Sequence, residues 1–146
     1  MKIIDLGWNR IISELKKADK SYTKVGVQEG AKSKDMSDLV IVAAANEFGT
    51  KRIPERSFIR STFDEQKRTL YPIIEKQYDK VLAGSATVKL ALSFIGMFLV
   101  AKTQQKIVDT HTPPNAPSTI RRKGSSHPLI DTGQLRQSIR NVEVIQ

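Results

Sequence analysis

Apolar residues recur every three or four positions over most of this chain, a spacing that predicts a mostly helical protein. The first such segment covers residues 3–19. Polar and charged side chains occupy the rest of its surface, so we expect an amphipathic helix that buries one face. The apolar residues predicted to share that face are Ile4, Trp8, Ile11, Ile12 and Leu15.

Three further helices follow from the same spacing. Residues 38–48 form one, with Ser37 as a candidate N-cap and Gly49 just after its end. A longer helix begins at Ser57, which is another candidate N-cap, and Pro72 is expected to kink or end it before helical spacing resumes. The most apolar helix covers about residues 88–108, capped by Thr87. Its apolar run of about 12 residues falls short of the roughly 18–20 that span a membrane. We therefore predict that it is a buried helix.

Two short segments near the ends of the chain alternate in the manner of strands. Residues 23–28 carry Val25 and Val27, and residues 140–145 carry Val142 and Val144. If these strands pair, the protein is an α+β domain, mostly helical, with a small antiparallel sheet.

A proline-rich and basic stretch, residues 112–128, precedes the last strand. Its four prolines favour extended geometry, and the cationic run Arg121, Arg122 and Lys123 has no apolar spacing. We predict a long loop that reaches a partner, since compact domains seldom keep such loops without a task. Residues 131–139 are predicted to anchor it through a short helix.

The anchoring helix has its own expected cap and buried face. Asp131 or Thr132 is the expected cap, and Leu135 and Ile139 are expected to share one face. Leu129 and Ile130 are expected to pack against the body of the protein beside them.

Composition narrows the class of protein. At 146 residues we expect one domain, and the absence of cysteine excludes disulfides and thiolate chemistry. No secretory signal is visible at the N-terminus. The net charge is +9, and most of the excess comes from residues 51–110, with 11 basic and 6 acidic groups. This balance suits a polyanionic neighbour, either nucleic acid or an acidic protein face, although a solubilising surface would look the same.

Candidate catalytic chemistry is sparse. Ser125 or Ser126, His127 and Asp131 superficially supply a nucleophile, a base and an orienting carboxylate. All lie within seven residues of one loop, where nothing holds the geometry of a triad. His111 and His127 are the only histidines and lack metal-ligand spacing. We therefore predict no enzymatic activity, no cofactor and no metal site.

Two groups of residues need a more specific explanation. The first joins Asn46-Glu-Phe-Gly-Thr50 to Ile53-Pro-Glu-Arg-Ser-Phe-Ile-Arg60. A helix end, a loop and a new helix account for the glycine, the proline and two core phenylalanines, Phe48 and Phe58. Glu47 beside Arg56 and Arg60 could pin the loop by an ion pair or serve an interface.

The second group is Pro128-Leu-Ile-Asp-Thr-Gly-Gln-Leu-Arg-Gln-Ser-Ile139. Arg136 and Arg140 are expected to project from it.

Together these two motifs, with Pro117-Ser-Thr-Ile-Arg-Arg-Lys-Gly-Ser125 before the second, resemble the neck and minor tail-component proteins of tailed bacteriophages. These are head–tail joining and tail-completion proteins, and they include Mu-like virion morphogenesis proteins. The resemblance covers roughly residues 24–140.

The resemblance implies a non-enzymatic structural subunit of the virion, assembled in the host cytoplasm as a homo-oligomeric ring at the head–tail junction or tail end. Portal, connector or tail proteins are the implied partners, packaged DNA is a possible non-specific contact, and no membrane is implied. The alternative is a sequence-independent DNA-binding or adaptor protein of phage assembly. The candidate interface residues are Glu47, Phe48, Gly49, Arg56, Arg60, Arg121, Arg122, Lys123, Asp131, Arg136 and Arg140.

Overall fold

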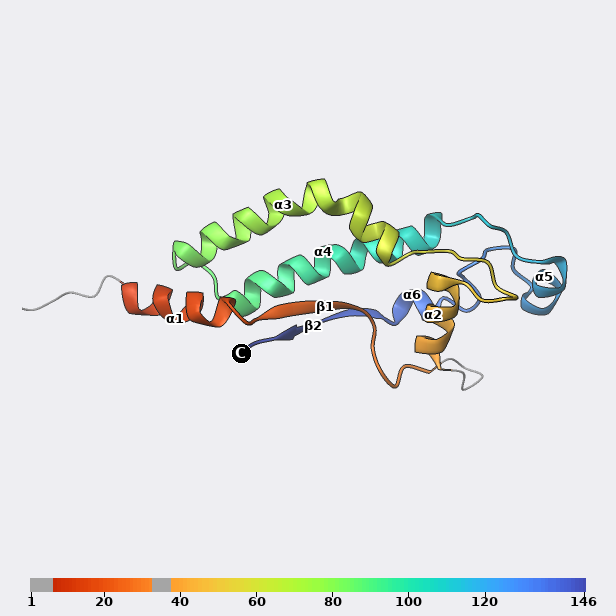
Figure 1. Ribbon diagram of the computed structural model, residues 1–146, viewed down its shortest axis with the longest axis horizontal. Coiled ribbons are helices and arrows are strands. Elements are labelled where there is room, and N and C mark those ends of the chain that lie inside the picture. The colour runs from red at the N-terminus through yellow and green to blue at the C-terminus, as the bar shows by residue number, and fades with distance from the viewer. Residues whose placement is uncertain (1–6, 33–37) are drawn as a thin grey trace, which may run out of the picture.

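A long helix, α4 (Val88–Asp109), lies between a second long helix and a two-stranded sheet (Figure 1). The computed structural model describes residues 7–32 and 38–146. The strands β1 (Tyr22–Val27) and β2 (Ile139–Val144) pair antiparallel, with Val25 opposite Asn141. This confirms the predicted pairing of the two end segments. It also confirms the α+β class, mostly helical with a small antiparallel sheet.

The first helix, α1 (Trp8–Ala18), lies at one end of the elongated molecule (Figure 1). The predicted apolar face is wrong in two respects. Trp8 is 66% exposed, and the buried residue of this helix is Glu14. The carboxylate of Glu14 accepts a hydrogen bond of 2.8 Å from the backbone N–H of Val88 and another of 2.7 Å from Lys17. A polar contact with the start of α4 therefore fixes the orientation of α1; Ile4 lies outside the described residues.

The short helix α2 (Leu39–Phe48) begins one residue later than predicted. Its N-cap is Asp38, whose side chain accepts a bond of 2.8 Å from the N–H of Val40. The predicted cap, Ser37, lies outside the described residues. Gly49 ends the helix as expected, at a φ of 71° that favours glycine.

Helix α3 (Arg60–Leu82) runs through Pro72 without a break and is bent along its length (Figure 1). The helical spacing on both sides of Pro72 therefore belongs to one helix. A tight turn joins α3 to α4, and the Thr87 hydroxyl caps α4 as predicted by accepting from the N–H of Leu90 at 3.2 Å. A small apolar cluster closes this end of the helical hairpin. Its buried members are Val81, Ala86, Val88 and Ala91.

The prediction of a structureless loop over residues 112–128 is wrong, because a helix, α5 (Pro117–Lys123), forms within it. Pro117 occupies the first helical turn, where a missing N–H costs nothing and the fixed φ suits a helix. Helix α6 (Gln134–Gln137) follows. Neither Asp131 nor Thr132 caps it; its N-cap is Gly133, and Thr132 bonds the Gln134 side chain instead.

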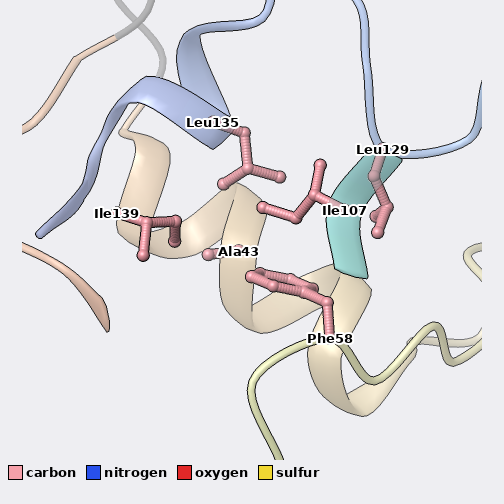
Figure 2. Close-up of a cluster of buried hydrophobic side chains, with 6 residues drawn as sticks. All are labelled: Ala43, Phe58, Ile107, Leu129, Leu135 and Ile139. Carbon is pink, nitrogen blue, oxygen red and sulfur yellow. The ribbon is translucent and has the colours of Figure 1, made fainter. Parts of the chain in front are cut away.

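The main core joins segments far apart in the sequence, and Figure 2 shows its six buried side chains converging. They come from α2, from the segment before α3, from the end of α4 and from the C-terminal segment. Phe58, Ile107 and Ile139 are fully buried. The predicted anchoring of the C-terminal segment is confirmed, with Ile130 packed at the cluster's edge. The cluster consists of Ala43, Phe58, Ile107, Leu129, Leu135 and Ile139.

Candidate functional site

Glu47 is the central residue of the first motif, and it lies buried at the end of α2. Its carboxylate does not bind the guanidinium of Arg56 or Arg60, so the first of the two alternatives, an ion pair with either arginine, is wrong. It accepts instead from the backbone N–H groups of Phe58, Ile59 and Arg60, at 2.8, 2.9 and 2.9 Å. The Ser57 hydroxyl donates a fourth bond of 2.9 Å. Glu47 therefore caps the start of α3 from another helix. The predicted cap, Ser57, contributes as well, because its hydroxyl accepts from the N–H of Ser61 at 3.3 Å.

The environment of Glu47 keeps its carboxylate ionised. Burial alone would raise its pKa and is the largest single influence, but the three backbone bonds and the Ser57 hydroxyl together outweigh it. The pKa of Glu47 consequently lies below its usual range. The negative charge also faces the positive end of the α3 dipole. A buried anion at this position holds α2 and α3 at a fixed angle.

Arg56 is also buried, and it faces the proline-rich segment rather than Glu47. Its Nε donates to the carbonyl oxygen of Pro113 at 2.7 Å, and Nη2 donates to that of Pro114 at 3.0 Å. The same guanidinium reaches the side-chain oxygens of Asn46 and Asn115, at 3.3 and 3.4 Å. Burial lowers the pKa of Arg56. One planar guanidinium thus ties α2 to the start of the segment that carries α5.

We call residues 110–128 the arm; it projects at the end of the molecule opposite α1 (Figure 1). Asn115 is buried and donates to the carbonyl oxygen of His127 at 3.1 Å, which closes the arm on itself. Lys123 donates to the same oxygen at 3.1 Å, and burial is the main cause that lowers its pKa. Lys123 therefore holds the arm together, whereas Arg121 and Arg122 are exposed on α5.

The remaining interface candidates lie on the surface. Phe48 is 68% exposed, so its predicted place in the core is wrong, while the prediction for Phe58 is confirmed. The Arg60 guanidinium lies 5.9 Å from the centre of the Phe48 ring and pairs with Glu55. The structure thus brings Phe48 and Arg60 together at the end of α2. Asp131, Arg136 and Arg140 are exposed too, but near α6 and β2.

Exposed apolar side chains continue from Phe48 along α2, where Val40, Ile41, Ala44 and Phe48 recur at helical spacing. Ile41 is as exposed as Phe48, at 68%. Exposed apolar groups also occur along α3 and α4. The prediction that α4 is a buried helix is therefore wrong for one side of it. The signal that indicates them is the number of apolar positions, since a helix apolar on all sides has more such residues than one partner can cover. These surface residues are Phe63, Tyr71, Ile74, Tyr78, Leu90, Phe94 and Met97.

The serine and histidine residues of the candidate triad make contacts within the arm and with its surroundings. The Nε2 atom of His127 lies 2.8 Å from the carbonyl oxygen of Val108, and the Ser125 hydroxyl donates to that of Ile130 at 3.4 Å. The His111 ring packs edge-on against the His127 ring, with centroids 5.0 Å apart. Among the described residues, no three His, Asp or Glu side chains gather in a way that could hold a metal ion. Within the same residues, no helix is long and apolar enough to cross a membrane.

Comparison with known proteins leaves the family open. The chain matches no protein-family model, no curated protein sequence and no solved structure. The functional conclusion therefore depends on the residues and their geometry.

Proposed function

We propose that this protein is a structural subunit of a bacteriophage virion that forms a ring at the head–tail junction, as a neck or tail-completion protein. The observation that carries the proposal is the exposed apolar row on α2, above all Ile41 and Phe48 at 68% exposure each. Soluble monomers seldom keep large apolar patches open to water, and such patches mark protein interaction sites.

The rigid frame under that row supports the same conclusion. The charged groups of Glu47 and Arg56 form hydrogen bonds within the protein, and these bonds fix α2, α3 and the arm relative to one another. A subunit that must fit identical neighbours benefits from a preorganised contact surface, because little conformational entropy is then lost on assembly. The motif that resembles the phage neck proteins is thus used mainly to build this frame.

Assembly into particles tests the proposal directly. In a phage whose copy of this gene is disrupted, we expect electron micrographs to show separate heads and tails. Supplying the wild-type gene in the host should restore joined particles, and the variant Phe48→Glu should not. Joined, infectious particles formed without the protein would overturn the proposal. Circular dichroism of the purified variant separates a lost contact from a lost fold.

The alternative function, sequence-independent DNA binding, is favoured by one observation: Arg121 and Arg122 are exposed at adjacent positions of α5. Helix α5 lies at one end of the molecule (Figure 1). Basic side chains in such a place can contact phosphates without reading sequence. Light scattering on the purified protein, alone and with duplex DNA at two salt concentrations, separates the two functions. Tight, salt-sensitive binding by a monomer supports the alternative. A discrete oligomer that ignores DNA supports the structural subunit.

A further inference from the structure

The α3–α4 hairpin carries two exposed apolar rows, one on each helix. On α4, Leu90, Phe94, Met97 and Ala101 recur at helical spacing, and the first three are 52–62% exposed. We call these four residues the α4 row. The first half of α4 is apolar on nearly all sides, and α3 and the sheet cover only part of its circumference. The α4 row is the part that they leave in contact with water.

The second row runs along α3, where Phe63, Tyr71, Ile74 and Tyr78 lie on one side and are 39–59% exposed. We call these residues the α3 row. Three of the four are aromatic, the type of side chain that is enriched in protein interfaces. Within the described chain, no element packs over either row closely enough to bury it.

The two rows face opposite sides of the hairpin. The Lys80 Nζ atom lies 5.8 Å from the centre of the Phe94 ring, so Lys80 is on the side of α3 that borders the α4 row. Tyr78 precedes Lys80 by two residues, which places it about 200° around the helix from Lys80. The α3 row therefore points away from the side on which Phe94 is exposed.

Lysines border the α4 row, whereas three carboxylates and two basic residues border the α3 row. Lys80 lies over Phe94, with Lys76 about one turn before it on α3, and Lys89 and Lys102 are the first two charges of α4. All four lysines are exposed. The α3 row is bordered instead by carboxylates, with Arg68 among them and Lys67 over the Phe63 ring. These exposed carboxylates belong to Asp64, Glu75 and Asp79.

We infer that the α3 row of one copy of this protein packs against the α4 row of the next copy. Two different and complementary faces on one subunit make a heterologous contact, which closes into a ring when the rotation between copies permits. The lysines beside one row then meet the carboxylates beside the other. The inference rests on the proposed ring and adds which surfaces of the subunit form it.

Cysteine cross-linking tests this contact, because the natural chain has no cysteine. The α3 variants are Tyr71→Cys and Tyr78→Cys, and the α4 variants are Leu90→Cys and Met97→Cys. In both pairs the positions are seven residues apart, or about two turns. Each α3 variant is mixed with each α4 variant under mild oxidation, and disulfide-linked dimers are measured on a non-reducing gel. Ser13→Cys, at an exposed site on α1, is the control for random collision.

We expect the α3–α4 mixtures to give at least about tenfold more dimer than either variant alone or than mixtures with the Ser13→Cys control. The favoured pairings also give the polarity. Tyr71 with Leu90 and Tyr78 with Met97 indicate parallel helices, and the crossed pairings indicate antiparallel ones. A chain with one cysteine in each row should form closed oligomers of defined size.

Two results would overturn the inference: equal dimer in all mixtures, or α3 variants that cross-link best with themselves, which indicates a two-fold contact. Its failure is distinguishable from that of the proposed function. If joined particles require the protein but the rows do not cross-link, the subunit uses other surfaces. If the rows cross-link but particles form normally without the protein, the contact stands and the virion role does not.

Discussion

The carboxylate of Glu47 and the backbone N–H of Ile59 lie 2.9 Å apart, so a residue at the end of α2 caps the start of α3. The N–H groups at the start of a helix have no partner within the helix. Glu47 accepts from the N–H of Arg60, the first residue of α3, and from those of Ile59 and Phe58 just before it. Residues 47–60 form a closed unit in which the loop cannot change shape without losing these bonds. Helices α2 and α3, which each carry exposed apolar residues, are held together by it.

Replacing Glu47 tests how much the fold depends on this cap. Glutamine keeps the shape but replaces one acceptor oxygen with an amino group that faces N–H donors. We expect Glu47→Gln to lower the free energy of unfolding by about 2–3 kcal/mol, as for buried bonds to a charged group. Urea unfolding followed by circular dichroism measures it. Glu29→Gln, at an exposed turn, should change stability by less than about 0.5 kcal/mol. Equal effects of the two variants would contradict the assignment.

The low pKa of Glu47 makes part of the stability depend on pH. The folded protein binds the ionised form better, so this contribution is complete above the unfolded pKa, near 4.5. It is lost as the pH falls from there through the lower folded pKa. We expect the stability difference between wild type and Glu47→Gln to be constant near neutral pH and to shrink below about 4.5. Denaturant titrations at a series of pH values measure it, and a difference that grows on acidification would refute this prediction.

Sequence reasoning found the residues of this motif but not their pairing. It placed Glu47 among cations because Arg56 and Arg60 are close in sequence. The sequence pattern does not show where the free N–H groups at the start of a helix will lie. Here these N–H groups, rather than a guanidinium, bind the carboxylate of Glu47. The pattern also does not predict helix α5, because Pro117 favours extended geometry before it but is compatible with the first helical turn, where it lies.

Elements whose signal is local were predicted well, including the paired end strands, the Thr87 cap and the anchoring Leu135 and Ile139. Which apolar positions reach solvent could not be predicted, because helical spacing identifies a face without showing whether another element covers it. Phe48 and Phe58 illustrate this, since similar contexts led to one exposed and one fully buried ring.

Arg56 holds the arm, and its replacement should loosen the arm selectively. Arg56→Lys keeps the charge but cannot reach the carbonyl oxygens of Pro113 and Pro114 together. We expect amide hydrogen exchange in residues 115–127 to accelerate by about tenfold or more, because the free energy of local opening falls. Exchange in the middle of α4 should not change. Arg52→Lys, at an exposed loop position, serves as the matched control. Uniform acceleration throughout the chain would instead indicate global destabilisation.

At Gly96, α4 packs closely against the sheet, and this position tests the packing between them. A Cβ atom there would lie 2.7 Å from both the Thr23 hydroxyl and the Asn141 amide nitrogen, and 2.8 Å from the Asn141 Cβ. Alanine normally stabilises a helix interior relative to glycine by roughly 0.5–1 kcal/mol. Here we expect Gly96→Ala to destabilise the protein by about 1–3 kcal/mol, because α4 must move away from β1 and β2.

Thermal unfolding of Gly96→Ala measures the effect, with Ser93→Ala on the same helix as the control for helix propensity. A rise in melting temperature for Gly96→Ala would mean that α4 does not lie this close to the sheet. A fall in melting temperature has a consequence for assembly as well, because α4 carries one of the two proposed contact rows. Displacing α4 shifts Leu90, Phe94 and Met97 relative to the α3 row. Gly96→Ala should therefore reduce cross-linking between the rows even at temperatures where the variant remains fully folded.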